Sequence, residues 1–548
     1  MDTKRLILFV VFSFSLLLLW DSWQRQNIDP SLEKPATSQD GIPTPSAAIV
    51  GESNDLPSNA SGYSLIKGNT VDVTTDKFNL TISEMGGDIR SLMLAKHLAD
   101  NSSENYVLFS DSPGSSLYVA QSGLLGTNLP THKSKFLFTQ NTYALNGDTL
   151  NVPMTFDSPE VSVKKTYQFS KNSYLINVRY DIENKTQSVL SSSAYYQLIH
   201  DGDSNQGSKL TPTFTGSAYF TEQEKFNKLA FSKTDNEPFS LVSNDGWMGI
   251  IQRYFATAWI ISAPSSRELY SKKIAENVYA AGLVTKLPDV APNQRIAFDV
   301  KLYAGPQSKD DLVLAAPGMK YTVDYGWLTF IAAPLFSVLS GLHKMVANWG
   351  ISIILLTVLI KILFYPLSAA SYRSMAQMRE LAPRLQSMKE RFGDDKQKMQ
   401  QAMMELYRTE KINPLGGCLP ILIQIPVFIG LYWMLLGSVE LRHAPFMWLT
   451  DLSQPDTLIG HIFGFPLGPL PILMAASMFL QTKLNPKPTD PMQAKLMLWM
   501  PIVFSIFFFF FPAGLVLYWL VNNILSIAQQ SYVNKKIHAE TLKKKGNA

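Results

Sequence analysis

Residues 356–368, LTVLIKILFYPLS, have the composition of a membrane-spanning helix with one lysine at the centre. The apolar surroundings run from Gly350 to Ala370, which is enough to cross the ~30 Å hydrocarbon core of a bilayer. Counted from Gly350 at about 1.5 Å per residue, Lys361 lies about 16 Å deep, near the middle of that core. A charge at this depth costs roughly 2.5–3.5 kcal/mol on insertion scales and is usually functional. The stretch therefore predicts a membrane domain and marks a candidate site.

The rest of the 548-residue chain divides into two unlike halves. Residues 24–320 are polar and rich in Ser, Thr and Asn, whereas residues 321–533 carry long apolar runs. The formal net charge of +4 is too small to indicate a nucleic-acid partner, and the single cysteine, Cys418, excludes an internal disulfide. We therefore expect a soluble domain joined to a polytopic α-helical membrane domain.

The first 23 residues combine a basic start with an apolar run. Lys4 and Arg5 precede apolar residues from Leu6 to Trp20. No A-x-A arrangement of small residues follows the run, which favours an uncleaved signal anchor over a cleaved signal peptide, the alternative. The basic end is then cytoplasmic. Residues 24–62 have the composition of a flexible linker.

Residues 63–320 are predicted to form a large all-β sandwich or barrel. Apolar and polar residues alternate with period two in several runs, and helical periodicity is nearly absent. The alternating apolar positions are Phe78, Leu80 and Ile82; Tyr174, Ile176, Val178, Tyr180 and Ile182; and Ile296, Phe298, Val300 and Leu302.

Residues 321–348 change to helical spacing and predict an amphipathic helix. Because this segment leads straight into a span, we expect it to lie flat on the outer membrane surface. A core helix of the β domain is the alternative. The apolar positions at helical spacing are Trp327, Phe330, Ile331, Pro334, Leu335, Val338, Leu342, Met345 and Val346.

The region 349–533 is predicted to contain five spans, which with the signal anchor make six. A turn at Pro512-Ala513-Gly514 divides the last apolar stretch, which is too long for one span. The expected spans are Gly350–Ala370, Leu419–Leu436, 469–481 with its flanks, 496–511 and 514–533.

The distribution of basic residues predicts the orientation. Loop 438–468 holds one basic residue, Arg442, whereas loop 371–413 holds nine and is therefore expected in the cytoplasm. Both termini then lie in the cytoplasm and the β domain in a periplasm-like space outside the inner membrane. The nine are Arg373, Arg379, Arg384, Lys389, Arg391, Lys396, Lys398, Arg408 and Lys411.

The loop 371–413 is predicted to be a helical hairpin. The sequence FGDDK forms its turn, with Asp394 or Asp395 as a helix cap. Flexible Met-rich faces can accept varied apolar segments, or these side chains only hold the two helices together. The apolar stripes comprise Met375, Met378, Leu381, Leu385, Met388 and Phe392 on one helix, and Met399, Met403 and Leu406 on the other.

The basic tail 534–548 carries Lys535, Lys536, Lys543, Lys544 and Lys545. It could contact ribosomal RNA or anionic lipid headgroups. The alternative is a positive-inside stop signal, and the two interpretations are compatible.

Lys361 lacks a carboxylate partner in the other spans, because the segments from 419 to 436, 469 to 481 and 496 to 533 contain no Asp or Glu. Water or neutral polar groups must then surround it, and we expect a hydrated groove open to the cytoplasm. A structural hydrogen-bond donor in a dry bundle is the alternative. The polar groups expected to converge are Thr357, Ser368, Gln424, Asn522, Asn523, Gln529 and Gln530.

A positive groove open on one side favours one function class. A conducting pore needs polar faces through the full membrane thickness, and a proton-coupled transporter usually carries membrane carboxylates. A groove that lends polar surface to a hydrophilic segment entering the membrane fits better, and short spans imply local thinning that would help.

The chain resembles the YidC/Oxa/Alb insertase family. The soluble part resembles the family's large periplasmic domain at EMGGDIRSL and DGWMGIIQRYFATAWI. The resemblance implies the six-span Gram-negative form with a periplasmic β-supersandwich. The membrane motifs, in order, are NWGISIILLTVLIKILFYPLSAASYRSMAQMRELAPRLQ, RFGDDKQKMQQAMMELYRTEKINPLGGCLPILIQIPVF, DPMQAKLMLWMP and FPAGLVLYWLVNNILSIAQQ.

The resemblance also implies site residues. The family carries a positive groove residue, most often arginine, where this chain has Lys361, so charge is shared and bidentate geometry is in doubt. Implied cargo contacts are Thr357, Gln424, Tyr518 and Trp519, and we add Asn522 to this groove. The hairpin corresponds to a loop implicated in receiving ribosomes or targeting factors, with candidate residues Arg379, Arg384, Asp394, Asp395 and Lys396.

The expected partners are nascent inner-membrane proteins, the Sec translocon with its accessory subunits, the ribosome, a targeting factor or receptor, and the lipid bilayer. No cofactor, metal or small-molecule substrate is expected. An enzyme in the β domain is a rival, because the family domain is similar to sugar-mutarotase sandwiches. However, His200 in HDGD is the sole histidine beside carboxylates, and no catalytic constellation has convincing spacing.

Overall fold

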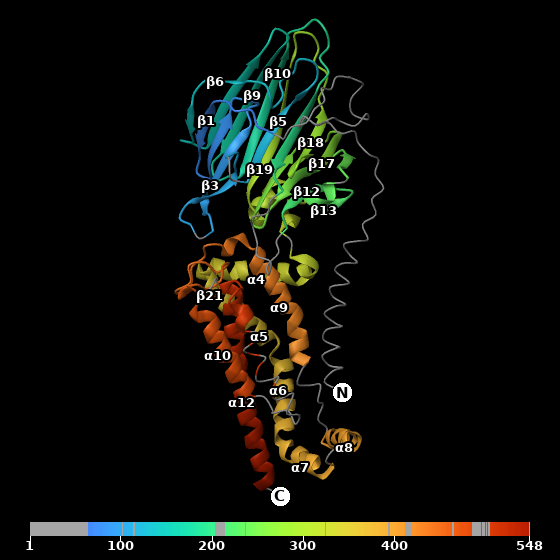
Figure 1. Ribbon diagram of the computed structural model, residues 1–548, viewed down its shortest axis with the longest axis vertical. Helices are drawn as coiled ribbons and strands as arrows, with labels where there is room; N and C mark the ends of the chain where they lie inside the picture. Colours follow the sequence, from blue (N-terminus) through green and yellow to red (C-terminus); the bar gives the residue numbers. More distant parts are fainter. Residues whose placement is uncertain are drawn as a thin grey trace.

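The computed structural model places a β domain at one end and a helical domain at the other (Figure 1). The signal anchor 1–23 and the linker 24–62 lie outside the described residues. The structure describes residues 64–546, apart from 101, 113–115, 203–213, 236, 324, 393–394, 411–418, 463–464, 485–494, 496–498, 500, 502 and 504.

Two large sheets form the β domain, as expected from the period-two runs. In the part of the chain described, the first sheet has ten strands. Their order is β14 (Phe239–Ser243), β17 (Arg267–Ala275), β18 (Val278–Lys286), β11 (Ser193–His200), β5 (Tyr118–Leu125), β3 (Ile89–Leu98), β2 (Phe78–Ser83), β1 (Thr70–Thr74) and β7 (Thr142–Ala144), and β4 (Asn105–Phe109) pairs with β3.

The second sheet has nine strands among the same described residues, and its paired neighbours are antiparallel. Their order is β13 (Lys225–Ala230), β12 (Gly216–Thr221), β15 (Trp247–Ile251), β16 (Phe255–Ile260), β19 (Arg295–Pro306), β10 (Leu175–Asn184), β9 (Val161–Ser170), β8 (Thr149–Asp157) and β6 (Leu137–Phe138). Two short helices, α2 (Phe231–Thr234) and α3 (Lys309–Ala315), accompany the sheets.

The alternating burial of side chains along β10 shows how a strand contributes to the core of the sandwich. In β10, Ile176, Val178, Tyr180 and Ile182 are buried, whereas the residues between them are at least partly exposed. Successive side chains of a strand point to opposite faces, so one face of β10 enters the core. The prediction of an all-β sandwich is therefore confirmed.

The motif EMGGDIRSL forms a tight turn before β3. Gly86 and Gly87 have φ of 70° and 60°, a conformation that glycine adopts without strain. A Cβ on Gly86 would lie 2.5 Å from the Cα of His132. The buried Lys165 Nζ donates to the carbonyl oxygens of both glycines at 3.0 Å, and the Tyr167 hydroxyl donates to that of Gly87 at 2.6 Å. The motif is thus a structural turn, which the side chains of Lys165 and Tyr167 in β9 hold in place.

Helix α4 (Thr329–Val346) follows two short 3-10 turns, η1 (Met319–Thr322) and η2 (Gly326–Leu328). It lies across the end of the helical domain that faces the β domain (Figure 1). Its buried residues Ala332, Phe336 and Leu339 belong to the hydrophobic cluster of the helical domain. Phe330 and Met345, from the apolar set named above, are 70% and 82% exposed. The alternative that this helix belongs to the β core is therefore wrong.

The predicted span Gly350–Ala370 is broken into two helices, which corrects the expectation of a continuous helix. Helix α5 (Trp349–Leu363) ends near Phe364, and α6 (Tyr365–Glu380) leaves at 67°. Pro366 lies in the first turn of α6. A proline lacks the backbone N–H donor and clashes with the carbonyl four residues earlier, so the helix breaks just before it.

Helices α7 (Ala382–Phe392) and α8 (Lys396–Thr409) form the predicted hairpin, which α6 joins to the bundle. Three further helices, α9 (Leu419–Gly437), α10 (Pro469–Leu484) and α12 (Ala513–Gly546), agree with expected spans. However, α12 continues through most of the residues expected as a separate tail. Between α9 and α10 lie η4 (Val439–Leu441) and a small hairpin of β20 (Gly460–Ile462) and β21 (Phe465–Leu467).

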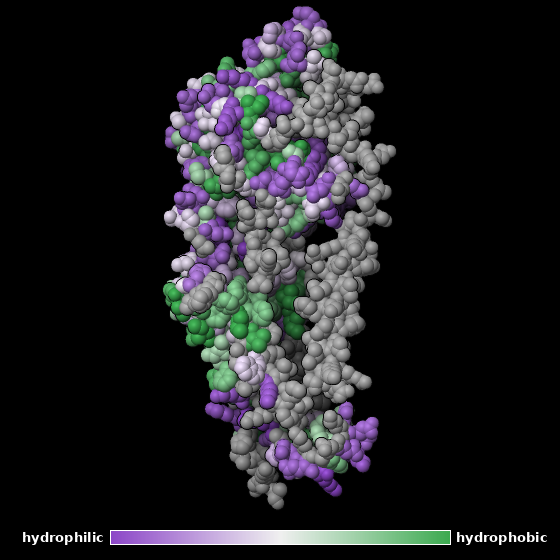
Figure 2. All heavy atoms as spheres, viewed as in Figure 1, coloured by the Kyte–Doolittle hydropathy of each residue, from purple (hydrophilic) through white to green (hydrophobic). Residues whose placement is uncertain are grey.

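Hydrophobic side chains gather at the level of α4 and α10, whereas the hairpin of α7 and α8 is largely hydrophilic (Figure 2). Within the described residues, α4 qualifies as a span by length and apolar composition alone, and the bent pair α5–α6 would qualify as one broken span. The first expected span and much of the fifth lie outside the described residues. The number of six spans therefore stays a prediction.

Candidate functional site

Lys361 lies in the last turn of α5 and turns its ammonium group toward α12. Its Nζ donates a hydrogen bond of 2.6 Å to Ser526 Oγ. Ser526 in turn donates to the carbonyl oxygen of Asn522 at 2.7 Å. Among the described residues, the Ser526 hydroxyl is the one hydrogen-bond acceptor of this ammonium group, and this hydroxyl is uncharged. Two of the three ammonium protons are left for other groups.

A second polar contact lies beside the first, between α9 and α12. Gln424 Nε2 donates to Asn522 Oδ1 at 2.9 Å and lies 3.4 Å from the Tyr518 hydroxyl. Tyr518, Asn522 and Ser526 follow one another at intervals of four residues, so they share one face of α12. One helix face thus presents polar groups to both Lys361 and Gln424.

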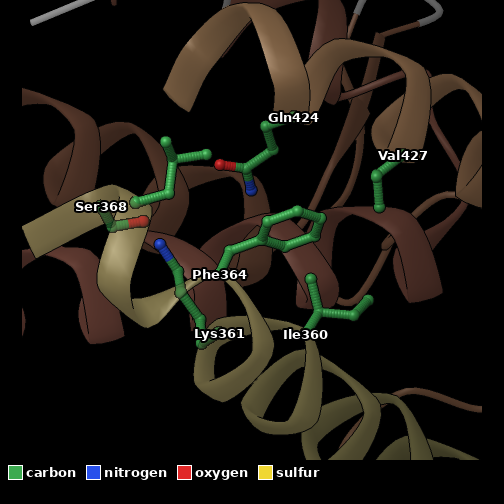
Figure 3. Close-up of a pocket in the computed structure, with 7 residues that line it drawn as sticks. Ile360, Lys361, Phe364, Ser368, Gln424 and Val427 are labelled. Carbon is green, nitrogen blue, oxygen red and sulfur yellow. The ribbon is translucent and has the colours of Figure 1, made fainter. Parts of the chain in front are cut away.

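A pocket opens between α5, α6 and α9 at this polar face. It comprises about 350 Å³ of empty space, part of which is continuous with the surroundings. Figure 3 shows the side chains of Lys361 and Gln424 extending toward the same space from different helices. The lining is mostly apolar, with one cation, one amide and one hydroxyl: Ile360, Lys361, Phe364, Leu367, Ser368, Gln424 and Val427.

Some polar residues expected to converge here face elsewhere. Thr357 is fully buried and donates to the carbonyl oxygen of Ile353 in its own helix at 2.7 Å. Asn523 donates to Ser477 on α10 at 3.1 Å. Gln530 donates to the carbonyl oxygen of Leu484 at 3.3 Å. By contrast, Gln529 donates to that of Tyr365, the first residue of α6, at 3.4 Å and so lies beside the α5–α6 break. The polar groups of α12 are therefore divided between two faces.

Trp519 lies in an aromatic cluster next to the polar face. Its ring centroid is 4.5 Å from that of Phe428 and 5.2 Å from that of Phe508. The indole Nε1 is buried and has no hydrogen-bond partner among the described residues. A buried N–H donor without a partner is costly, so this group is available to an acceptor that enters the cluster.

Ser526 is the residue that the sequence argument missed. A hydroxyl in an apolar helix gives no strong signal, because serine often bonds to the carbonyl of its own helix. The spacing of four from Tyr518 through Asn522 would have pointed to it.

The hairpin residues take several roles. Asp395 accepts a hydrogen bond from the Lys398 N–H at 3.1 Å and caps the start of α8. Arg384 forms an ion pair of 2.6 Å with Glu410, which connects the two arms. Arg379 is exposed at the end of α6. Lys396 begins α8, and Asp394 lies outside the described residues.

The histidine of the rival enzyme hypothesis is enclosed in the β domain. His200 is fully buried, and its ring lies 4.8 Å from that of Tyr118 and 5.3 Å from that of Phe231. Asp201 accepts hydrogen bonds from the Ser116 hydroxyl and the Leu117 N–H. These bonds hold the loop after β11, and the described residues contain no cluster of three metal-ligating side chains.

Two family models match the chain. The one described as 60Kd inner membrane protein matches residues 341–540, and the one described as YidC periplasmic domain matches residues 70–338. The first covers the helical domain from the last turns of α4 onward, and the second covers the β domain and the first part of α4.

Full-length relatives give the same result. A membrane protein insertase YidC of Methylobacillus flagellatus is 53% identical, with 100% of both chains covered. One of Laribacter hongkongensis is 48% identical with 100% of both chains covered, and one of Aromatoleum aromaticum is 46% identical over 98% of this chain and 99% of the relative.

Solved structures are more distant. The crystal structure of an active YidC insertase with its first transmembrane domain resolved has a TM-score of 0.40 at 18% identity, covering 84% of this chain and 92% of that chain. A putative aldose 1-epimerase from Escherichia coli K12 has a TM-score of 0.29 at 11% identity, covering 43% of this chain and 98% of that chain. On the sequence relatives, the chain belongs to the YidC family of membrane protein insertases.

Proposed function

We propose that this protein inserts proteins into the bacterial inner membrane and helps them fold and assemble there. The observation that carries the proposal is the position of Lys361. It is a cation within an apolar helix, it is bonded to a neutral hydroxyl, and it borders a pocket. Membrane cations in such settings usually serve substrates or ions.

The groove works by supplying polar surface where the bilayer offers none. A hydrophilic segment of a nascent chain needs partners for its charges and backbone groups while it crosses. Lys361, Gln424 and Ser368 border the pocket and can supply these partners. Acidic segments gain most, because the groove charge is positive. The apolar residues around the pocket then allow the cargo's own span to pass into lipid.

The proposed orientation of the chain in the membrane follows from the distribution of basic residues between its loops. Residues 371–413 and both termini lie in the cytoplasm, and the β domain lies in the periplasm. The chain crosses the membrane six times and the groove opens to the cytoplasm. Helix α4 rests on the outer membrane surface, which agrees with the exposure of Phe330 and Met345.

The cytoplasmic hairpin is proposed to receive ribosomes or a targeting factor and its receptor. Arg379 and Arg384 offer positive charge to such partners, and the cap at Asp395 fixes the start of α8. Arg384 is already paired with Glu410, so Arg379 is the freer contact. The protein acts alone or beside the Sec translocon and its accessory subunits. It performs no chemical step and needs no cofactor.

Depletion of the protein tests the function. We expect small membrane proteins of one or two spans to remain uninserted, measured by protease protection of their periplasmic segments. Normal insertion of such cargo after depletion would contradict the insertase function.

Cysteine accessibility tests the hydrated groove. In a Cys418→Ser background, single cysteines at positions 361 and 424 should react with a polar thiol reagent added from the cytoplasmic side. A cysteine at position 357 is the matched control, because Thr357 is fully buried and should react much more slowly. Equal inertness at all three positions would indicate a dry bundle.

A further inference from the structure

Arg442 is the single basic residue of the loop 438–468, which connects α9 to α10. Basic residues are disfavoured in external loops. This one is almost entirely enclosed, with a side-chain exposure of 2%. An enclosed arginine needs partners, and these partners come from the β domain.

The β domain supplies a carboxylate and an aromatic cage. Arg442 Nε and Nη2 donate to Asp100 Oδ1 at 3.0 and 2.7 Å. The guanidinium carbon lies 5.3, 5.7 and 5.6 Å from the ring centroids of Tyr106, Tyr254 and Phe255. A guanidinium stacked on aromatic rings and paired with a carboxylate is a favourable and directional arrangement.

Neighbouring residues of the loop strengthen the contact. Val439 is buried in the hydrophobic core cluster of the β domain, whereas Leu441 is buried in that of the helical domain. His443 Nε2 lies 3.3 Å from the carbonyl oxygen of Leu98 at the end of β3. Residues 439–443 therefore connect the two domains through both apolar and polar contacts.

The cage also gives a role to a sequence motif that the insertase mechanism does not use. Tyr254 and Phe255 belong to the motif DGWMGIIQRYFATAWI. Both are buried, Phe255 as the first residue of β16 and Tyr254 directly before it, and their rings lie close to the Arg442 guanidinium of the helical domain.

We propose that the segment 439–443, here called the dock, fixes the β domain on the membrane domain through Arg442. The dock begins two residues after α9 ends, so it also holds the outer end of the helix that carries Gln424. Domains within one chain usually move relative to each other unless their interface is large and well packed.

Distance measurements on the full chain test the dock. In a Cys418→Ser background, spin labels are placed at Lys171→Cys in the β domain and at Ile472→Cys on α10, both at exposed positions. The labelled protein is reconstituted in lipid nanodiscs without cargo. We expect one narrow distance distribution for the otherwise unchanged chain.

The substitution Arg442→Glu puts a carboxylate beside Asp100 and should broaden the distribution about twofold or more, as the β domain gains freedom. Asp100→Asn, at a half-exposed position, is the milder variant and should broaden it less. Arg295→Glu is the matched control, since it removes an exposed ion pair with Glu183 away from the interface, and it should leave the width unchanged.

The proposal is overturned if Arg442→Glu and Asp100→Asn both keep the narrow distribution, or if Arg295→Glu broadens it equally. The measurement requires no insertion activity. Its failure is therefore distinguishable from failure of the proposed insertase function.

Discussion

Two lysines, Lys165 in the β domain and Lys361 in the membrane domain, are both withdrawn from bulk water and differ in what surrounds their ammonium groups. Lys165 is fully buried and bonds to two carbonyl oxygens, and it lies over the rings of Tyr167 and Tyr180. Burial lowers the pKa of Lys165 to about 8, and the Asp88 carboxylate opposes that change. Lys361 bonds to one hydroxyl and borders a pocket.

We interpret this difference as one between a structural charge and the charge of the proposed groove. A buried ion is tolerated when nearby groups satisfy all of its donors, and the cost of removing one partner is then large. Lys165 comes closer to that condition, with two carbonyl acceptors, two aromatic rings and the nearby Asp88 carboxylate, and it holds the turn at Gly86 and Gly87. Lys361 keeps donors that its described neighbours leave unused, and for this reason we propose that a passing segment binds them.

The largest expected effect is on stability, from Lys165→Met. It removes one of the two cations near Asp88, whose ion pair with Arg90 remains, and it leaves the Gly86 carbonyl without the ammonium donor, whereas the Gly87 carbonyl keeps the Tyr167 hydroxyl. The buried acceptor and the weakened charge pairing should lower the free energy of unfolding by about 3 kcal/mol. Chemical unfolding of the full chain in detergent, followed by fluorescence of the β domain tryptophans, measures this. The matched change Lys361→Met should alter stability much less, and equal losses would erase the distinction between the two lysines.

A pH-dependent effect on stability comes from His132, another buried base of the β domain. Burial lowers the pKa of His132 to about 3, and nearby Lys133, Arg90 and Lys165 add to this. Below pH 6.5 the His132 imidazole is protonated in the unfolded chain but stays neutral in the folded chain. The free energy of unfolding therefore falls as pH falls. Between pH 7 and 5 the loss should be about 2 kcal/mol.

The variant His132→Gln isolates that contribution, because other titrating groups such as Asp88 are common to both proteins. Its unfolding free energy should vary less between pH 7 and 5 than that of the unchanged chain, by about 2 kcal/mol. Parallel pH profiles would contradict the assignment and indicate that the His132 imidazole is protonated in the folded protein.

Insertion activity should depend on the charge of Lys361. We expect Lys361→Glu to slow insertion of an acidic cargo by about tenfold, equivalent to about 1.4 kcal/mol, because the groove then repels the segment. Lys361→Ala should be impaired less, and Lys361→Arg should retain activity. Insertion into proteoliposomes, measured by protease protection, checks this order. Equal activity of the Arg and Glu variants would show that charge is not the requirement.

The smallest expected effect belongs to Ser526→Ala. If water fills the groove, it replaces the lost hydroxyl as a partner for Lys361, and insertion should fall by about twofold or less. In a dry bundle the same change would leave an unpaired charge and impair activity as strongly as Lys361→Glu. Measuring both variants in one assay therefore distinguishes a wet groove from a dry bundle.

Sequence patterns predicted most of the architecture, because period two and apolar runs follow directly from burial. They also identified the isolated charge at Lys361. The break at Phe364 was missed although Pro366 gave a local signal, since span length dominated the interpretation. Which face of α12 meets Lys361 depends on helix packing, so Ser526 was overlooked and Thr357 was placed in the groove without a structural contact to it.

The break at Phe364 also changes the electrostatics of the site. By ending α5 two residues after Lys361, it brings the carboxyl end of a helix, with its partial negative charge, next to the ammonium group. Such a helix end stabilises a cation by about 0.3–1 kcal/mol, and by up to about 2 kcal/mol when partly buried. A proline five residues along the chain thus supplies, through the backbone, part of the countercharge that no carboxylate in the expected spans provides.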